Sequence, residues 1–333
     1  TCINEYVQGG IVKKWEIVLK ELRNLHLLPA FVLFAAFIVI NILVTKNFLT
    51  LSYMKGVAIN NAPLICLTMG MSVVIISGGI DLSLGTLLSV VNTLCVTFTA
   101  LGWNPVLVIL VCLLVGAGIG MINGLVVGYL RIPPLLATFA MSTILEGLAL
   151  IILPKPGGNP DQGVMKWYRT GVLGVPIATF AILLVALTGV FILKSKFGIL
   201  VRATGYNEKE AFFSGIHTGR IKLYTYMIAG LFGGLGGILM TYGINSADAT
   251  IGTDMCMQCI AACVIGGVDL AGGQGHSLGA LWGILFLTFA SSVIVALGLD
   301  TFSQNFWSGM VLLISLLGSV ILMKRSKKAI GLD

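Results

Sequence analysis

The sequence predicts an all-α polytopic membrane protein with about ten transmembrane helices and both termini in the cytoplasm, on three observations. Hydrophobic residues make up 57 % of the 333 residues and charged residues only 10 %, which leaves too little polar surface to cover a water-soluble domain. The apolar residues gather in runs of about 20, the length that a helix needs to cross a bilayer. The basic residues, whose excess gives a net charge of +7, concentrate between these runs, as the positive-inside rule describes. We therefore attribute the charge to topology in a lipid bilayer and expect no nucleic-acid partner.

Ten apolar runs define a transmembrane domain over residues 27–323. They are 27–44, 58–76, 82–101, 105–130, 135–153, 174–193, 223–243, 255–269, 277–297 and 306–323. Residues 1–26 form an amphipathic segment at the cytoplasmic surface, and residues 324–333 form a basic cytoplasmic tail. Six spans from an inside start return the loop 194–222 to the inside, which agrees with its charge, since it carries Lys194, Lys196, Arg202, Lys209, Arg220 and Lys222. Five basic residues are left outside: Lys46, Lys55, Lys155, Lys166 and Arg169.

A glycine-rich break separates the second run from the third. It reads Ser77-Gly78-Gly79-Ile80-Asp81-Leu82-Ser83, and residues 77–83 are called the first break below. In lipid, backbone N–H and C=O groups must be satisfied within the protein, so such a break must be buried or line a wet cavity. We expect the Asp81 side chain to cap a helix that begins at Leu82. Direct contact of Asp81 with a solute or ion is the alternative.

The fourth run carries glycines at every fourth position, Gly116, Gly120, Gly124 and Gly128. They leave one helix face without side chains, so a neighbouring helix can approach closely. The seventh run repeats this spacing from Gly230 to Gly234 and from Gly233 to Gly237. No Gly-Lys pair occurs in the chain, so we expect no phosphate-binding loop among these glycines.

The fifth run contains the one acid predicted near mid-depth, Glu146. It lies eleven residues past Leu135, hence about 16 Å along the helix. A charge at that depth costs about 2.5 to 3.5 kcal/mol. Glu146 therefore either faces the bundle interior or a watery cavity in a functional role, or is kept neutral or hydrogen-bonded to a neighbouring helix. The same two roles, solute path or interhelical hydrogen bonding, are open for the other polar residues inside the runs: Asn60, Asn61, Asn92, Asn123, Thr138 and Ser142.

A second break, residues 266–273, follows the eighth run. It lies 188 residues after the first, and five of its eight positions repeat residues 78–85, which predicts an internal repeat. Gly266 and Gly267 match Gly78 and Gly79, and Asp269 matches Asp81, so we expect a helix break and cap here too. Counting crossings places both breaks on one face, which favours a parallel repeat.

Cysteines and histidines offer little chemistry. Cys256, Cys259 and Cys263 share one helical face, which makes a metal or redox site conceivable. Buried cysteine commonly behaves as a small hydrophobe, however, and Asp254 is the one acid nearby, so we expect no metal. The three histidines lie in or next to predicted loops, so a buried His–carboxylate pair, and with it a membrane enzyme, is not expected.

Four landmarks make the chain resemble the permease subunits of bacterial ABC importers for ribose, galactose and related monosaccharides. The landmarks are the first break; Ile132-Pro133-Pro134 followed by Ala137-Thr138; Gly205-Tyr206-Asn207 with Ala211 and Ser214-Gly215-Ile216; and Ala261-Ala262-Cys263-Val264-Ile265-Gly266-Gly267 leading to Gly272-Gly273-Gln274-Gly275. They follow the family's order and cover nearly the whole chain.

The resemblance implies a multi-pass protein of the bacterial inner membrane that binds no cofactor itself. It implies a second permease subunit, identical or different, a periplasmic or lipid-anchored solute-binding protein, and cytoplasmic ATPase subunits that bind ATP and Mg. Residues 205–216, called the coupling segment below, are implied to meet the ATPase. Their family-like positions are Gly205, Asn207, Ala211, Ser214, Gly215 and Ile216.

The sequence departs from the family at three places. Cys256-Met257-Gln258 stands where the family often has Glu-Leu-Asp, Glu146 where an arginine is frequent, and Asp269 where a small polar residue is usual. The substrate therefore stays open, and an ABC permease for a non-sugar solute is one alternative. An ion-coupled secondary transporter, with Glu146 or Asp81 binding the ion, is another.

Overall fold

The computed structural model describes residues 28–298, 306, 309–310 and 313–314. Every regular element in this part of the chain is an α-helix. The helices are α2 (Leu28–Val44), α3 (Leu51–Ile76), α4 (Leu84–Ala100), α5 (Pro105–Gly128), α6 (Pro134–Ile152), α7 (Gln162–Thr170), α8 (Ile177–Lys194), α9 (Lys196–Tyr206), α10 (Glu208–Phe213), α11 (Thr218–Ile244), α12 (Met255–Ile265) and α13 (Ser277–Ala296). The prediction of an all-α polytopic membrane protein is confirmed.

The first nine apolar runs each coincide with a helix, namely α2 to α6, α8 and α11 to α13. Six helices in the described residues are long and apolar enough to cross a membrane: α3, α5, α6, α8, α11 and α13. The helices α2, α4 and α12 are shorter. Most of the tenth run, with the predicted segments 1–26 and 324–333, lies outside the described residues.

The second span is longer than predicted. Its apolar run begins at residue 58 because Lys55 and Gly56 interrupt the hydrophobic residues, yet α3 already begins at Leu51. The hydroxyl of Thr50 accepts a hydrogen bond from the Tyr53 N–H at 3.4 Å and so caps the helix. The extra turns therefore follow from local capping, which a hydrophobicity pattern does not detect.

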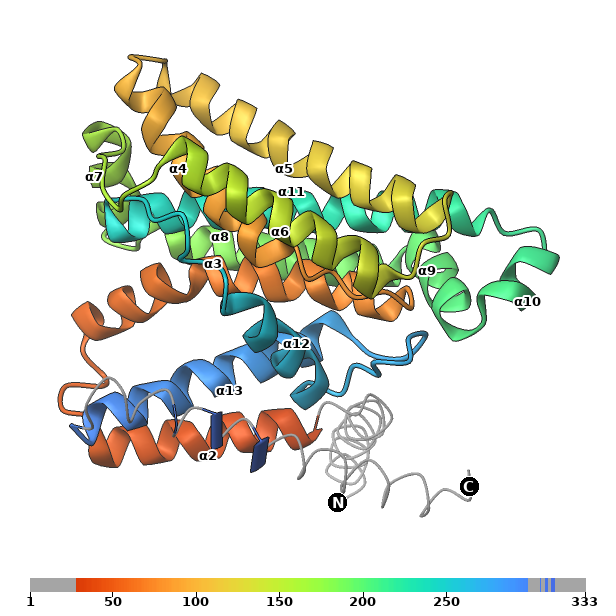
Figure 1. Ribbon diagram of the computed structural model, residues 1–333. Coiled ribbons are helices and arrows are strands. Elements are labelled where there is room, and N and C mark those ends of the chain that lie inside the picture. The colour runs from red at the N-terminus through yellow and green to blue at the C-terminus, as the bar shows by residue number, and fades with distance from the viewer. Residues whose placement is uncertain (1–27, 299–305, 307–308, 311–312, 315–333) are drawn as a thin grey trace, which may run out of the picture.

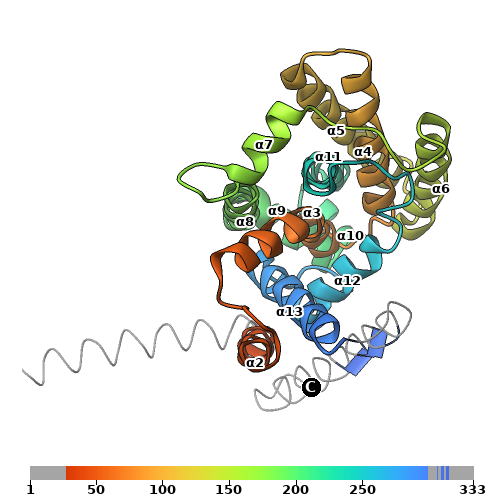
Figure 2. The same cartoon turned by 90° about the vertical axis from the view of Figure 1, so that its left-hand side faces the viewer.

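Two helices form the centre of the bundle. Figure 2 shows α3 and α11 inside a ring of the other long helices. Most residues of α3 and α11 are buried, whereas most of α5, α6 and α8 are not. The outer helices expose apolar side chains, and their backbone groups are hydrogen-bonded within each helix. These exposed faces therefore suit contact with lipid.

The bundle has two ends, seen in Figure 1. The α7 end carries α7 and the α2–α3 and α4–α5 connections. The α10 end carries α9, α10 and the α5–α6 connection. The two breaks and the coupling segment lie at the α10 end, which is therefore where we look for the functional site.

The glycine ladder of α5 packs directly against α11. A Cβ added at Gly116 would lie 2.5 Å from the carbonyl oxygen of Gly230, and one at Gly120 would lie 2.3 Å from that of Tyr226. Both distances are shorter than any real contact, so the two backbones approach as closely as glycine permits. The predicted close helix approach at this ladder is confirmed.

Candidate functional site

Three segments far apart in sequence meet at the α10 end through their glycines. A Cβ added at Gly205 would lie 2.0 Å from the Ile76 carbonyl oxygen, and one at Gly272 would lie 2.7 Å from the Cα of Gly78. The Gly273 N–H donates to the same Ile76 oxygen at 2.9 Å. We call Gly78, Gly205, Gly272 and Gly273 the glycine junction. It joins both breaks to the start of the coupling segment without intervening side chains.

The two breaks begin with the same backbone turn. The helix ends are closed by Gly78 at φ +79° and Gly267 at φ +80°, the left-handed conformation that glycine adopts freely. The Gly78 N–H bonds to the Ile75 oxygen and the Gly267 N–H to the Val264 oxygen, each at 2.9 Å. These equivalent positions differ by 267 − 78 = 189 residues, one more than the sequence spacing.

This shift changes which residues correspond. With an offset of 189, Asp81 corresponds to Leu270, so the matching of Asp81 with Asp269 that the sequence suggests is wrong in the structure. Asp81 is buried, whereas Asp269 is partly exposed and its carboxylate accepts the local Ala271 N–H, at 3.0 Å. Asp269 caps no helix, because α13 begins at Ser277. The predicted cap at Asp269 is therefore wrong.

Asp81 orders the first break in a way that differs from the prediction. The helix α4 begins at Leu84, two residues later than expected, with Ser83 at the N-cap position. The Asp81 carboxylate accepts from the Ser83 N–H at 2.9 Å and from the Ser83 hydroxyl at 2.6 Å, which closes a local turn ahead of the helix. The amide of Asn123, on α5, donates to the Ser83 hydroxyl at 2.8 Å. These partners favour a structural role for Asp81.

Thr138 joins α6 to the same break. Its hydroxyl accepts from the Leu82 N–H at 3.1 Å and lies 3.2 Å from the Ile80 carbonyl oxygen. The Leu82 N–H is thus satisfied from another helix, while Asp81 satisfies the N–H of Ser83. Backbone groups inside a membrane protein need such partners.

His276 and Arg202 hold the loop that follows the second break. The Nδ1 of His276 accepts from the Leu278 N–H at 3.4 Å at the start of α13. Arg202, on α9, donates to the carbonyl oxygens of Leu193 at 2.5 Å and Gly275 at 3.2 Å. Burial, with the positive charges of Arg202 and Lys194, lowers the pKa of His276. The neutral imidazole is therefore the form that fits this loop.

The coupling segment consists of the end of α9, the short helix α10 and the turn after it. The Asn207 side-chain oxygen accepts from the Lys209 N–H at 3.1 Å and the Glu210 N–H at 3.2 Å, and so caps α10. Ala211 is buried and anchors the helix, while Gly215, at φ +86°, ends it. The remaining predicted positions are Ser214, whose hydroxyl donates to the Glu210 oxygen at 2.8 Å, and Ile216, whose N–H bonds to the Ala211 oxygen at 3.0 Å.

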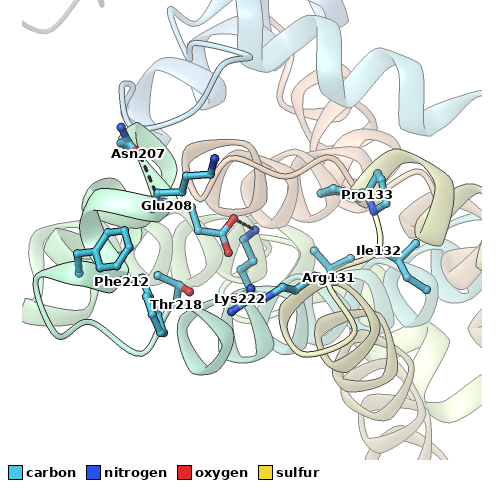
Figure 3. Close-up of a pocket in the computed structure, with 12 residues that line it drawn as sticks. Arg131, Ile132, Pro133, Asn207, Glu208, Phe212, Thr218 and Lys222 are labelled. Carbon is cyan, nitrogen blue, oxygen red and sulfur yellow. Dashed lines mark hydrogen bonds and ion pairs between the residues drawn. The ribbon is translucent and has the colours of Figure 1, made fainter.

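A groove of about 830 Å³ separates the coupling segment from the α5–α6 connection (Figure 3). It is lined by Val127, Arg131, Ile132, Pro133, Pro134, Asn207, Glu208, Lys209, Phe212, Phe213, Thr218 and Lys222. Lys222 forms an ion pair with Glu208. The guanidinium of Arg131 lies 6.0 Å from the centre of the Phe212 ring, within reach of a cation–π interaction. The groove thus combines aromatic surface with basic side chains.

Two of the predicted path residues are engaged between helices. The Asn92 amide is buried, donates to the Thr241 hydroxyl at 2.9 Å and accepts from the Asp248 N–H at 2.8 Å. Ser142, on α6, accepts from the Thr86 hydroxyl at 3.3 Å. With Thr138 at the first break, these side chains hold helices together at three separate places.

Of the other three path residues, Asn60 and Asn61 lie apart from these, whereas Glu146 follows Ser142 by one turn of α6, just as Ser142 follows Thr138. Asn60 and Asn61 line a cavity of about 460 Å³ between α2, α3 and α13, and Asn61 accepts from the Thr288 hydroxyl at 3.1 Å. Glu146 is partly exposed on α6. The structure therefore does not bring the six path candidates together in one site.

The three cysteines of α12 face the core. The sulfur atoms of Cys259 and Cys263 lie 3.8 and 3.7 Å from carbonyl oxygens of α3, and that of Cys256 lies 3.4 Å from the Asp81 carbonyl oxygen. Among the described residues no group of three or more His, Cys, Asp or Glu side chains could hold a metal ion. Packing and weak S–H···O contacts account for this face.

Sequence reasoning missed three contacts of the site: the Glu208–Lys222 ion pair, the Arg131–Phe212 contact and the bonds of Arg202. Glu208 and Lys222 flank a turn, and Arg131 comes from another connection. These residues are polar and lie on different segments, so a pattern of hydrophobic residues along the sequence does not connect them. The basic charge of the loop was the one signal that pointed to them.

The sequence is similar to those of known transport proteins. A family model described as the branched-chain amino acid transport system / permease component matches residues 53–320. The ribose import permease protein RbsC of Bacillus subtilis (strain 168) is 35 % identical over 309 residues, which cover 90 % of this chain and 93 % of that protein. The galactose/methyl galactoside import permease protein MglC of Haemophilus influenzae is 28 % identical over 305 residues, covering 85 % and 91 %.

A third relative is the autoinducer 2 import system permease protein LsrC of Yersinia enterocolitica, 31 % identical over 310 residues that cover 90 % of this chain and 83 % of that protein. No solved structure matches the chain. The family model spans most of the transmembrane domain, both breaks and the coupling segment. The chain therefore belongs to this family of transport-system permeases, and the resemblance to monosaccharide import permeases found in its sequence is confirmed.

Proposed function

We propose that the protein is the permease subunit of an ATP-driven importer and forms the path for a monosaccharide or similar small polar solute across the bacterial inner membrane. The observation that carries the proposal is the glycine junction, which places the coupling segment in direct contact with both helix breaks. A movement at α10 can therefore reach the centre of the bundle. The relatives are named as import permeases for ribose and for galactose, which supports a monosaccharide as the solute.

The proposed topology has ten spans, with both termini and the α10 end in the cytoplasm. Basic residues gather at that end, on α8 to α11, as the positive-inside rule requires. Cytoplasmic ATPase subunits, which bind ATP and Mg, then meet α10 and the groove of Figure 3. Phe213 is 85 % exposed there, and an exposed aromatic side chain is a typical anchor of a protein interface.

The remaining partners follow from the same topology. A periplasmic or lipid-anchored solute-binding protein delivers the solute at the α7 end. A second permease subunit, identical or different, completes the path. The chain has no catalysis of its own and binds no cofactor in this scheme, since the ATPase supplies the energy.

Reconstitution tests the function directly. The permease, its ATPase subunits and its binding protein are placed in proteoliposomes, and uptake of labelled ribose and galactose is measured. ATP-dependent uptake that requires all components is expected. Uptake driven by a proton or sodium gradient without the ATPase would instead favour an ion-coupled transporter, and ATP-dependent uptake of a non-sugar solute alone would correct the substrate.

A further inference from the structure

The turn between α7 and α8 presents apolar side chains to the outside. Leu173 is fully exposed at its tip, and Val172 is 51 % exposed beside it. The backbones of Val172 and Val175 exchange two hydrogen bonds, of 3.1 and 3.0 Å, so the turn is closed and holds Leu173 outward. On the preceding helix, Trp167 is 56 % exposed. A fully exposed leucine held by a closed turn, in the same stretch of chain as an exposed tryptophan, suits an apolar or amphipathic surrounding.

The exposed turn continues a lipid-facing surface. Between Thr179 and Lys194, which are exposed near its two ends, the side chains that α8 exposes lie on one helix face and are apolar: Phe180, Leu183, Leu184, Leu187 and Phe191. The turn is followed by Pro176, the N-cap residue of this helix, and Figure 2 shows the turn projecting sideways from the ring of helices. A surface on top of the bundle, where a soluble protein docks, would not project in this direction. A sideways projection at the end of an apolar helix face instead suits the membrane–water boundary, where Trp is enriched.

Two ammonium groups accompany the turn. The Nζ of Lys55 lies 3.8 Å from the position that a Cβ on Gly174 would take, and Lys166 is exposed next to Trp167 on α7. Across the described residues the one ion pair is Lys222–Glu208, so neither Lys55 nor Lys166 pairs with a carboxylate there. Both belong to the few basic residues that the positive-inside rule leaves at this end. Their charge is therefore available for a phosphate group.

We propose that Lys55, Lys166, Trp167 and the turn 172–175, together called the interfacial patch, bind the membrane surface in the leaflet at the α7 end. Leu173 and Trp167 enter the boundary between headgroups and acyl chains. The two lysines bind the phosphates of phospholipid headgroups, because long basic side chains reach toward that layer. The patch fixes the depth of the α7 end in the bilayer, as an interfacial amphipathic helix does.

Fluorescence quenching tests the patch in proteoliposomes of the whole chain. Leu173→Cys is labelled with an environment-sensitive fluorophore in a Cys2→Ser background, since every described cysteine is buried. Two matched positions serve as controls: Asn159→Cys, exposed on the connection that precedes α7, and Leu187→Cys, on the apolar face of α8. The label at 173 should be quenched by a nitroxide near the headgroup, the label at 187 by a nitroxide near the acyl-chain end, and the label at 159 by neither.

The charge of the headgroup tests the lysines. Quenching at 173 by nitroxide-labelled phosphatidylglycerol should exceed that by phosphatidylcholine by up to roughly fivefold for each lysine, and Lys55→Gln with Lys166→Gln should remove the excess. Equal quenching by both lipids would overturn the role of the lysines. A label at 173 that behaves like that at 159, or one shielded only after a solute-binding protein is added, would overturn the membrane contact. These quenching measurements do not depend on transport activity, so they test the patch independently of the proposed function.

Discussion

At the scale of single residues, Asp81 determines how the first break is built. Its carboxylate holds the Ser83 N–H and hydroxyl, so Asp81→Ala leaves buried donors without a partner. We expect the free energy of unfolding to fall by about 1 to 3 kcal/mol. Asp81→Asn keeps an accepting oxygen and should be much milder. Melting temperatures in detergent and solute uptake are measured for both. Equal stability with uptake abolished in both variants would point to direct solute contact instead.

Glu146, on α6, is the acid that we expect to act on the passing solute through its charge. It lies partly exposed on α6, and a charge at this depth is costly unless it is solvated or paired with a solute or partner subunit. Glu146→Gln keeps the shape and removes the charge. We expect uptake to change severalfold while the complex still assembles, measured by transport and by size-exclusion chromatography. Unchanged uptake would show that the charge of Glu146 plays no part in transport.

His276 makes stability depend on pH. Burial lowers the pKa of His276 below the usual value of about 6.5, so the unfolded chain binds a proton more readily than the folded one. The stability from the neutral imidazole is therefore present above pH of about 6.5 and is lost as the pH falls toward the folded pKa. The melting temperature should drop over this window. His276→Asn, which keeps a capping acceptor, should flatten the dependence; an unchanged slope in that variant would contradict the assignment.

At the scale of elements, the α5–α11 contact is the clearest case of helix packing that depends on missing side chains. A Cβ at Gly120 would lie 2.3 Å from the Tyr226 oxygen, whereas one at Gly118, half a turn away, meets nothing within 4 Å. Gly120→Ala should therefore destabilise the fold by about 1 to 3 kcal/mol. Gly118→Ala should be neutral or stabilising, because alanine favours the helix. Thermal unfolding of the two variants checks this, and similar losses in both would contradict the packing.

The elements themselves were largely predictable, because length and hydrophobicity decide whether a segment crosses a membrane. The first nine runs are helices for that reason. The errors arose at the helix starts: α3 starts seven residues early at Leu51, after the Thr50 cap, and α4 starts two residues late at Leu84, after the turn that Asp81 closes.

The site was predictable only in part. The family motifs located the coupling segment and both breaks, and the glycine junction shows that they touch. The pairing of the two aspartates failed because a one-residue shift in the turn is invisible to sequence matching. The solute path stays a prediction; in the structure Asn92, Thr138 and Ser142 are each hydrogen-bonded to another segment, to Thr241, Leu82 and Thr86. Hydrogen-bond partners that lie far apart in the sequence cannot be predicted from the residues around either one.

At the scale of the whole molecule, a short series of direct contacts connects the coupling segment to both breaks and to the helices around them. The coupling segment contacts the first break at Gly78 and the second at Gly272 and Gly273, and the first break is bonded to α5 and α6 through Asn123 and Thr138. Backbone contacts of this kind leave little room for independent movement, because close-packed surfaces transmit displacement. In this account the ATPase acts on α10 and thereby moves both breaks together.

Uptake per ATP hydrolysed in the Gly205→Ala permease, reconstituted with its ATPase and binding protein, tests this claim most directly. The added Cβ would lie 2.0 Å from the Ile76 oxygen and 2.6 Å from the Gly273 nitrogen, so the junction must open. Gly118→Ala is the control, and co-purification with the ATPase confirms assembly. We predict that Gly205→Ala still assembles and hydrolyses ATP but transports at least severalfold less solute per ATP than the control. An unchanged ratio in an assembled Gly205→Ala complex would contradict the account.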